Sequence, residues 1–293
     1  MFTVEHIKEN SASVLEIRNA DKALLALVNL KSGGSLDVLE LEGAKIISNE
    51  GALPFASSVL FPFANRIAKG QYTFEGQTYQ LKKGEVDPNN AIHGLIYDKE
   101  FEVVNQEVTS EKATVTMRCE QAAPQEGFPF LYSVELTYAV SNSELTLTVD
   151  VENIGNQSFP FTLGWHPYFE SKNLWESHLI MDCKGKLKVD EFMIPVEKEA
   201  LQLPSELQIG EQQFDDCFLL GDTTVGFKTP DYHIAIATTS KENYLQVYTP
   251  PGRKSMAIEP QTGPANSFNS AMGLQVLQPQ ERYNLSWNIQ KIG

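Results

Sequence analysis

The sequence YSVELTYAVSNSELTLTVDV, residues 132–151, indicates the fold class of this chain. Side chains of a β-strand point alternately to opposite faces, so a strand with one buried face shows an apolar residue at every second position. Such residues occur on both sides of a Ser141-Asn142 pair: Tyr132, Val134, Leu136, Tyr138, Val140, Leu145, Leu147, Val149 and Val151. The pattern predicts two half-buried strands joined by a turn at Ser141 and Asn142.

The same period of two recurs at 72–81 around a Glu75-Gly76 turn, and again at 114–119, 234–236 and 283–289. No long segment has the 3.6-residue period of a helix, which argues against a parallel α/β sheet. We therefore expect an all-β protein built as a large antiparallel β-sandwich. No linker rich in Pro, Gly or Ser divides the sequence, so one domain over residues 1–293 is expected. Residues 171–213 read as a long irregular excursion.

The composition argues against several classes of partner. Acidic residues outnumber basic ones by 38 to 23, and the formal net charge is −15. Nucleic acids and anionic membranes need concentrated Lys and Arg, so neither is expected as a partner. There is no signal-peptide pattern and no apolar run of membrane-spanning length, which predicts a soluble cytoplasmic protein. The three widely spaced cysteines suggest neither a disulfide framework nor a zinc site.

Residues 248–268, YTPPGRKSMAIEPQTGPANSF, contain the first candidate catalytic group. The apolar run 256–258 reads as the end of a buried strand, and Glu259 follows it directly. Because Pro260 has no N–H to donate, we expect the chain to leave the sheet just after Glu259. A carboxylate held between a strand and a stiff turn suits a base whose position must be fixed. The alternative is a surface carboxylate at the start of a loop, which is the commoner situation.

Three basic residues stand in unusual settings. Arg66 follows an apolar run, where a guanidinium must find an acceptor, either on a ligand or in a structural ion pair. His93 precedes Gly94, which permits close backbone approach, and His166 lies among aromatic residues. Each histidine alone is more often a hydrogen-bonded core residue, but the two together with Glu259 weaken that interpretation.

Asp215 and Asp216 are adjacent carboxylates in an aromatic setting. On a strand they would point to opposite faces, so one can face a pocket while the other meets solvent. The alternative is a turn with two solvated carboxylates. The chain has no HExxH, GxSxG, P-loop or GxGxxG motif, and the spacing of His93 and His166 does not support a metal triad. We expect no metal and no cofactor.

Taken in order, five short stretches resemble the aldose 1-epimerases, also called galactose mutarotases. They are Asn65-Arg66, His93-Gly94, His166-Pro167-Tyr168-Phe169, Phe214-Asp215 and Glu259-Pro260-Gln261. The resemblance covers nearly the whole chain. It implies the large β-sandwich of that family, the galactose mutarotase-like supersandwich. It also implies interconversion of the α and β anomers of a free aldose without a cofactor.

The resemblance also implies roles for individual residues. Glu259 would remove the proton of the C1 hydroxyl, and His166 would protonate the ring oxygen, so that the ring opens and closes again on the other face. Five residues are implied to bind the sugar: Arg66, His93, Asp215, Asn65 and Gln261. A carboxylate such as Asp215 near His166 would favour the imidazolium form of that histidine.

Two departures from the family pattern concern the choice of sugar. Pro167 replaces the Thr of the Asn-His-Thr-Tyr-Phe pattern of the best-known galactose mutarotases, and Asp216 replaces a His that often follows the aspartate. A related branch acts on hexose 6-phosphates. The acidic balance argues against that branch, although Lys69, Arg253 and Lys254 could hold a phosphate.

We expect an enzyme that acts on a neutral hexose of the glucose or galactose type, as a monomer or homodimer. Three alternatives remain at this point. They are a hexose-6-phosphate 1-epimerase, a non-catalytic sugar-binding protein on the same fold, and a glycoside hydrolase that uses Glu259 and Asp215 as its carboxylate pair.

Overall fold

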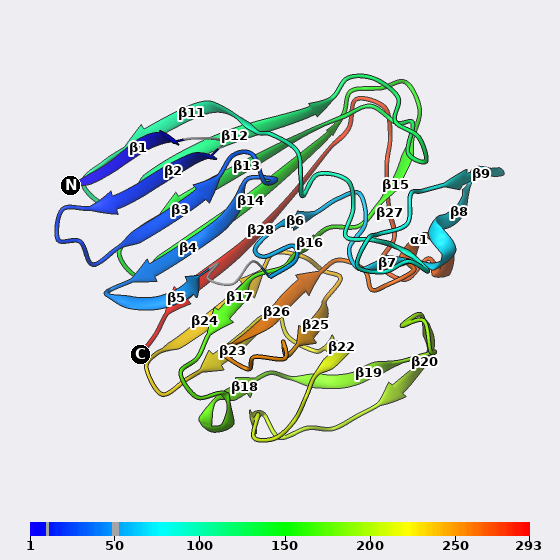
Figure 1. Cartoon of the computed structure of the whole chain (residues 1–293). Coiled ribbons are helices and arrows are strands. Elements are labelled where there is room, and N and C mark those ends of the chain that lie inside the picture. Colours follow the sequence, from blue (N-terminus) through cyan, green and yellow to red (C-terminus); the bar gives the residue numbers. More distant parts are fainter. Residues whose placement is uncertain (10–11, 49–52) are drawn as a thin grey trace.

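The computed structural model describes residues 1–9, 12–48 and 53–293, and within them two large antiparallel sheets lie one over the other (Figure 1). The larger has 13 strands and the smaller has nine among the described residues. The larger sheet runs in the order β1 (Phe2–Glu9), β2 (Ala12–Asn19), β3 (Leu25–Asn29), β4 (Ser35–Leu41), β5 (Ala44–Ser48), β17 (Tyr168–Glu170), β26 (Ser255–Gln261), β25 (Tyr244–Tyr248), β22 (Asp215–Leu220), β19 (Cys183–Val189) and β20 (Pro195–Ala200), with β16 (Gly164–Trp165) pairing with β26 and with β6 (Val59–Leu60).

The smaller sheet takes its strands from the middle and the end of the chain. Its order is β11 (Glu102–Val108), β12 (Ala113–Gln121), β13 (Tyr132–Val140), β14 (Glu144–Asn153), β28 (Arg282–Lys291), β24 (His233–Thr238), β23 (Thr224–Lys228), β18 (His178–Ile180) and β21 (Glu206–Gln208). Two-stranded sheets join β7 (Arg66–Ile67) to β10 (Ala91–Ile92), β8 (Gln71–Phe74) to β9 (Gln77–Gln80), and β15 (Phe159–Phe161) to β27 (Gln275–Leu277). The helical segments are η1 (Ala68–Gly70), η2 (Leu174–Glu176) and α1 (Ser267–Ser270).

The predicted hairpin at 132–151 is confirmed. Strands β13 and β14 pair in register, with Leu136 opposite Val149 and Tyr138 opposite Leu147. These four side chains are fully buried, while the residues between them are partly exposed. The hairpin at 72–81 is confirmed as β8 and β9. The all-β, antiparallel sandwich class expected from the alternation is therefore correct.

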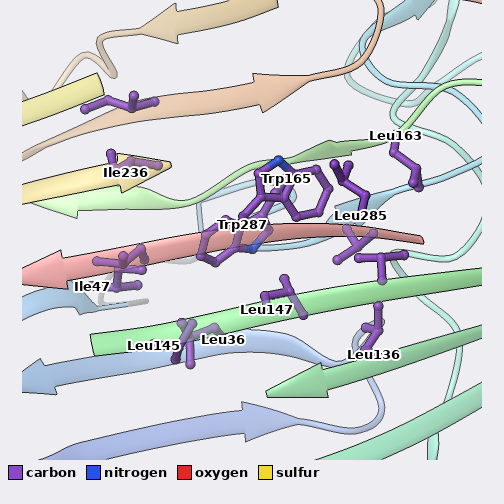
Figure 2. Close-up of a cluster of buried hydrophobic side chains, with 14 of the residues drawn as sticks. Leu36, Ile47, Leu136, Leu145, Leu147, Leu163, Trp165, Ile236, Leu285 and Trp287 are labelled. Carbon is purple, nitrogen blue, oxygen red and sulfur yellow. The ribbon is translucent and has the colours of Figure 1, made fainter. Parts of the chain in front are cut away.

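The core lies between the two large sheets. Trp165 of the larger sheet stacks on Trp287 of the smaller one, with ring centroids 6.1 Å apart (Figure 2). Figure 2 also draws Leu36 of β4 with Leu145 and Leu147 of β14 in one cluster of buried side chains, to which both sheets contribute. Burial of this layer is the dominant favourable term that joins the sheets.

Two expectations about the course of the chain are wrong. The stretch 171–213 is not an irregular excursion, because β18 to β21 lie within it and extend both large sheets. Its strands are short or mostly exposed, as β20 shows, so they lack the clear apolar alternation of the central strands.

The chain also does not leave the sheet just after Glu259, since β26 continues beyond it. The N–H groups of Ile258 and Thr262 donate to the ends of the segment 163–167. N–H groups two residues apart on a strand point to the same neighbour, so an N–H at position 260 would point at the middle of segment 163–167. The middle of segment 163–167 pairs with β6 and with residues next to it instead, at the level of Pro260.

In the part of the chain that the structure describes, no helix is long and apolar enough to cross a membrane.

Candidate active site

Four neighbouring strands of the larger sheet, β17, β26, β25 and β22, bring polar residues to one face of that sheet. Gln246 lies directly opposite Glu259, and Tyr248 lies directly opposite Asp215. Tyr168 has the same orientation, because residues opposite each other in an antiparallel pair, and residues two apart on one strand, share a face. The alternate residues of β25 and β26 face the core between the sheets. Strand register alone thus gathers these five side chains.

The remaining predicted residues come from turns beside this face. His93 follows β10 with a positive φ of 60°, and its N–H donates to the carbonyl of Asn65. A Cβ at Gly94 would lie 2.3 Å from the carbonyl oxygen of Phe61, and φ there is +79°, so only glycine fits. The close backbone approach expected at Gly94 is therefore found, and it fixes where His93 enters the site.

A cavity of about 340 Å³ lies on this face, at the small end of the range of about 300–1,000 Å³ for ligand sites. Six of the seven residues predicted for catalysis or binding line it: Asn65, Arg66, His93, His166, Asp215 and Glu259. Gln261, the seventh, is buried and does not line the cavity, but its side-chain amide donates to Glu259 Oε2 at 3.2 Å. The structure thus brings together residues that are far apart in sequence.

Glu259 and His166 form a buried pair. Glu259 Oε1 lies 3.4 Å from His166 Nε2, and the two residues are only 2% and 5% exposed. The more common expectation for Glu259, a solvated loop carboxylate, therefore does not hold. A carboxyl group and an imidazole at this distance can pass a proton between them and to a third group placed beside both.

Burial sets the protonation of this pair. Loss of hydration raises the pKa of Glu259 well above its ordinary value, and the charge of Asp215 raises it further. Burial lowers the pKa of His166 to about 4. Burial therefore favours a protonated Glu259 beside a neutral His166. This differs from the expectation that Asp215 would hold His166 as an imidazolium.

His93 is also neutral in this site. It is 7% exposed, and burial lowers its pKa well below the ordinary value, with further lowering from His166 and Arg66. The rings of His93 and His166 meet edge to face with centroids 5.0 Å apart. The Nδ1 atoms of both rings are buried and have no hydrogen-bonding partner among the described residues. Buried polar atoms of this kind cost stability unless a ligand or water pairs with them.

A chain of hydrogen bonds crosses the cavity wall from Asp215 to Asp87. Gln246 Nε2 donates to Asp215 Oδ1 at 2.8 Å, and Asn65 Nδ2 donates to Gln246 Oε1 at 3.3 Å. Arg66 Nη1 donates to Asn65 Oδ1 at 3.1 Å, and Arg66 Nε donates to Asp87 Oδ2 at 2.8 Å. Arg66 forms the structural ion pair considered from the sequence, and it also lines the cavity.

The side chains of the two adjacent aspartates, Asp215 and Asp216, point to opposite faces of β22, as expected for a strand. Asp215 lines the cavity, whereas Asp216 points the other way and pairs with Lys186 at 3.1 Å. The side chain of Asp215 is exposed, but the walls of the cavity remove part of its hydration, which raises its pKa. The positive charge of Arg66 lowers the same pKa and so opposes this effect. The question of which aspartate faces the pocket is settled in favour of Asp215.

Four cavity or near-cavity residues were not singled out from the sequence: Asp87, Gln246, Tyr168 and Tyr248. Gln246 carried a usable signal, because it is a polar residue inside the otherwise apolar or aromatic stretch 244–248. Asp87 stands in an Asp-Pro-Asn-Asn stretch that reads as an ordinary turn. The three basic residues considered for a phosphate, Lys69, Arg253 and Lys254, do not line the cavity. No group of three His, Cys, Asp or Glu side chains among the described residues could hold a metal ion.

Comparison with known proteins adds an independent line of evidence. A family model described as aldose 1-epimerase matches residues 15–290. The uncharacterized protein YihR of Escherichia coli is 27% identical over 274 residues, which cover 88% of this chain and 87% of YihR. Mouse galactose mutarotase is 26% identical over 217 residues, covering 67% of this chain and 60% of the mouse protein.

Solved structures show the same fold. A galactose mutarotase-like protein from Clostridium acetobutylicum has a TM-score of 0.89 at 21% identity, covering 100% of this chain and 98% of that one. A galactose 1-epimerase from Lactobacillus acidophilus has a TM-score of 0.83 at 17% identity, again covering 100% of this chain and 98% of the other.

Proposed function

Because the chain belongs to the aldose 1-epimerase family, we propose that it interconverts the α and β anomers of a free hexose of the glucose or galactose type. Membership places the protein among isomerases of the mutarotase kind. The observation that carries the proposal is the Glu259–His166 pair, with its two side chains 3.4 Å apart at the buried end of a cavity of monosaccharide size.

The spacing of the pair suits the reaction. The C1 hydroxyl and the ring oxygen O5 are bonded to the same carbon, so the groups that serve them must be close together. Glu259 takes the proton of the C1 hydroxyl while His166 gives a proton to O5. The O1 electron pair forms the carbonyl, and the C1–O5 bond breaks. After rotation about C1–C2, O5 attacks the other face and both protons return.

The pair holds one proton before and after ring opening. An ionised Glu259 beside an imidazolium becomes a protonated Glu259 beside a neutral imidazole, which is the form that burial favours. Ring opening therefore ends in the intrinsically preferred form of the pair. Hydrogen bonds from the bound sugar are needed to stabilise the ionised form that begins the step. Gln261, which donates to Glu259, supports that form from behind the cavity.

The charges around the cavity favour a neutral sugar. Arg66 is the only Lys or Arg among its described lining residues, and it is already paired with Asp87. Glu259 and Asp215 line the same cavity, so a phosphate group would meet carboxyl groups rather than free cations. Asp215, Gln246 and Asn65 offer the acceptors and donors that sugar hydroxyls require.

We also propose that residues 1–293 act as one domain, as a monomer or homodimer. The larger sheet contains strands from residues 2 to 261, and the smaller one pairs β14 with β28 near the end of the chain. A division of the sequence between β17 and β18 would break the pairing of β16 and β17 with β26 in the larger sheet and of β14 with β28 in the smaller one.

The test is the rate at which freshly dissolved α-glucose and α-galactose approach anomeric equilibrium, followed by polarimetry or NMR. We expect acceleration over the spontaneous rate in proportion to protein concentration. Binding of sugar without acceleration would indicate a sugar-binding protein. Release of the aglycone from aryl glycosides would indicate a hydrolase.

A further inference from the structure

We propose that Asp87 is a positioning residue: it holds the guanidinium of Arg66 in the orientation that the sugar requires. The inference rests on the proposed function for the identity of the ligand. Asp87 lies between β9 and β10, it is 9% exposed, and it does not line the cavity. Its side chain is linked to the cavity by its hydrogen bond to Arg66, which lines it.

Asp87 is itself held firmly by the surrounding chain. Its Oδ1 accepts the backbone N–H groups of Asn89 at 3.0 Å and Asn90 at 3.1 Å. Its Oδ2 accepts Arg66 Nε at 2.8 Å and Asn90 Nδ2 at 3.1 Å. Burial opposes ionisation, but the hydrogen bonds from Asn90 and Arg66 outweigh it and keep the pKa of Asp87 below its ordinary value. Asp87 is thus a fixed carboxylate at neutral pH.

Asn90 ties this carboxylate to more distant segments. It is 2% exposed, and its Nδ2 also donates to the carbonyl of Phe192 at 3.1 Å. Its Oδ1 accepts the backbone N–H of Lys69 at 3.1 Å. The anchor of Asp87 therefore includes the segment that follows Arg66 and the turn between β19 and β20, so it does not depend on one loop alone.

Two bonds fix the plane of the Arg66 guanidinium. Nε is committed to Asp87 and Nη1 to Asn65, which leaves Nη2 without a hydrogen-bonding partner among the described residues. A planar guanidinium held at two of its nitrogens presents its remaining N–H groups in defined directions. The positive charge of Arg66 lowers the pKa of both Asp215 and Glu259. The ion pair with Asp87 offsets part of that charge. Arg66 can then orient a neutral hydroxyl without acting as an unpaired cation.

The experiment compares Asp87→Asn, Arg66→Lys and the double variant by steady-state kinetics on galactose and glucose. Asp87→Asn keeps the shape of the side chain but replaces one of its two acceptor oxygens with an NH2 donor. We expect kcat/KM to fall by about 10- to 100-fold, with KM raised as well as kcat lowered, as for small displacements of positioning groups. In the Arg66→Lys background, Asp87→Asn should have a smaller effect, because a lysine has no planar guanidinium for Asp87 to orient.

A matched control is available on β2. Glu16 is also an arginine's ion-pair partner: it accepts two hydrogen bonds from Arg18, one of them from Arg18 Nη2 to Glu16 Oε2 at 3.0 Å. Glu16→Gln breaks a comparable pair away from the cavity and should leave kcat and KM unchanged. Unchanged kinetics in folded Asp87→Asn, or the same fold-loss in the wild-type and Arg66→Lys backgrounds, would overturn the proposal.

A second readout does not depend on turnover. The chain has five arginines, Arg18, Arg66, Arg118, Arg253 and Arg282, so the Arg66 Nε–H NMR signal can be assigned by its loss in Arg66→Lys. We expect this proton to exchange slowly in the wild type and at least tenfold faster in Asp87→Asn, with Asp87→Glu intermediate. Slow exchange in Asp87→Asn would overturn the inference. A wild type that binds but does not epimerise sugars would refute the proposed function alone.

Discussion

The substitution Glu259→Gln is the most informative change in the site. It keeps the size of the side chain and retains an oxygen that can accept the hydrogen bond from Gln261. It removes only the ability to take up a proton. Because Glu259 is 2% exposed and sits in a packed strand, a substitution of equal volume should leave the fold intact.

The expected loss follows from the role of the group. One positioned general base contributes about 10²–10⁴-fold to a rate. This corresponds to about 2.7–5.4 kcal/mol of activation free energy at 1.36 kcal/mol per factor of ten. We expect kcat to fall by that factor. KM should change little, because the lost interaction belongs to the transition state.

The Glu259→Gln variant should also differ from the wild type in how its free energy of unfolding depends on pH. The pKa of Glu259 is raised by folding, so the wild type takes up a proton at this site when it folds. That contribution is complete below the unfolded pKa and declines as pH rises toward the folded pKa. Gln does not titrate. The stability of Glu259→Gln relative to wild type should therefore increase with pH above about 4.5, by at most about 1.4 kcal/mol per pH unit.

Two assays check these expectations: the rate of anomer equilibration above the spontaneous rate, and thermal unfolding at several pH values. A folded Glu259→Gln protein with near wild-type kcat would refute Glu259 as the base, and Asp215 would be the next candidate. A relative stability that falls with rising pH would refute the protonation that burial implies for Glu259.

Four further outcomes are expected. His166→Asn should lower kcat by about 10²–10⁴-fold, and the double variant with Glu259→Gln should lose far less than the product of the two losses, as kinetics on both singles and the double will show. Since the pKa of His166 in the protein without sugar is lowered to about 4, the acid limb of the kcat/KM profile should lie near that value, and a limb near pH 6.5 would contradict the account. Gly94→Ala places a Cβ 2.3 Å from the Phe61 carbonyl at φ +79° and should cost at least about 1–3 kcal/mol, measured by denaturant unfolding. Glucose should give a higher kcat/KM than glucose 6-phosphate in a direct comparison, and the reverse order would show that the site accepts a phosphate.

Most of the central strands could be predicted from the sequence, because an antiparallel sheet with one buried face imposes a period of two. The 132–151 hairpin is the clearest case, with a fully buried residue at alternate positions of both strands. The strands between 178 and 208 could not be found in this way. They are short or lie at sheet margins, where exposed polar residues such as those of β20 carry little pattern.

Part of the candidate site could also be predicted from the sequence, but for a different reason. Glu259, His166 and Asp215 each stand in a distinctive local setting, so they could be named before any coordinates. The support of Arg66 by Asp87 depends on a contact between residues 21 positions apart, which neither local sequence shows. The continuation of β26 past Glu259 depends on where segment 163–167 turns away from it, which is a property of the neighbouring strand.

The measurement that tests the central claim most directly is exchange NMR on galactose or glucose already at anomeric equilibrium. At equilibrium no net conversion occurs, so cross-peaks between the α and β H1 signals report interconversion itself. The account predicts that catalytic amounts of the protein produce these cross-peaks and that Glu259→Gln at the same concentration does not. Folded wild-type protein that binds the sugar without producing cross-peaks would contradict it.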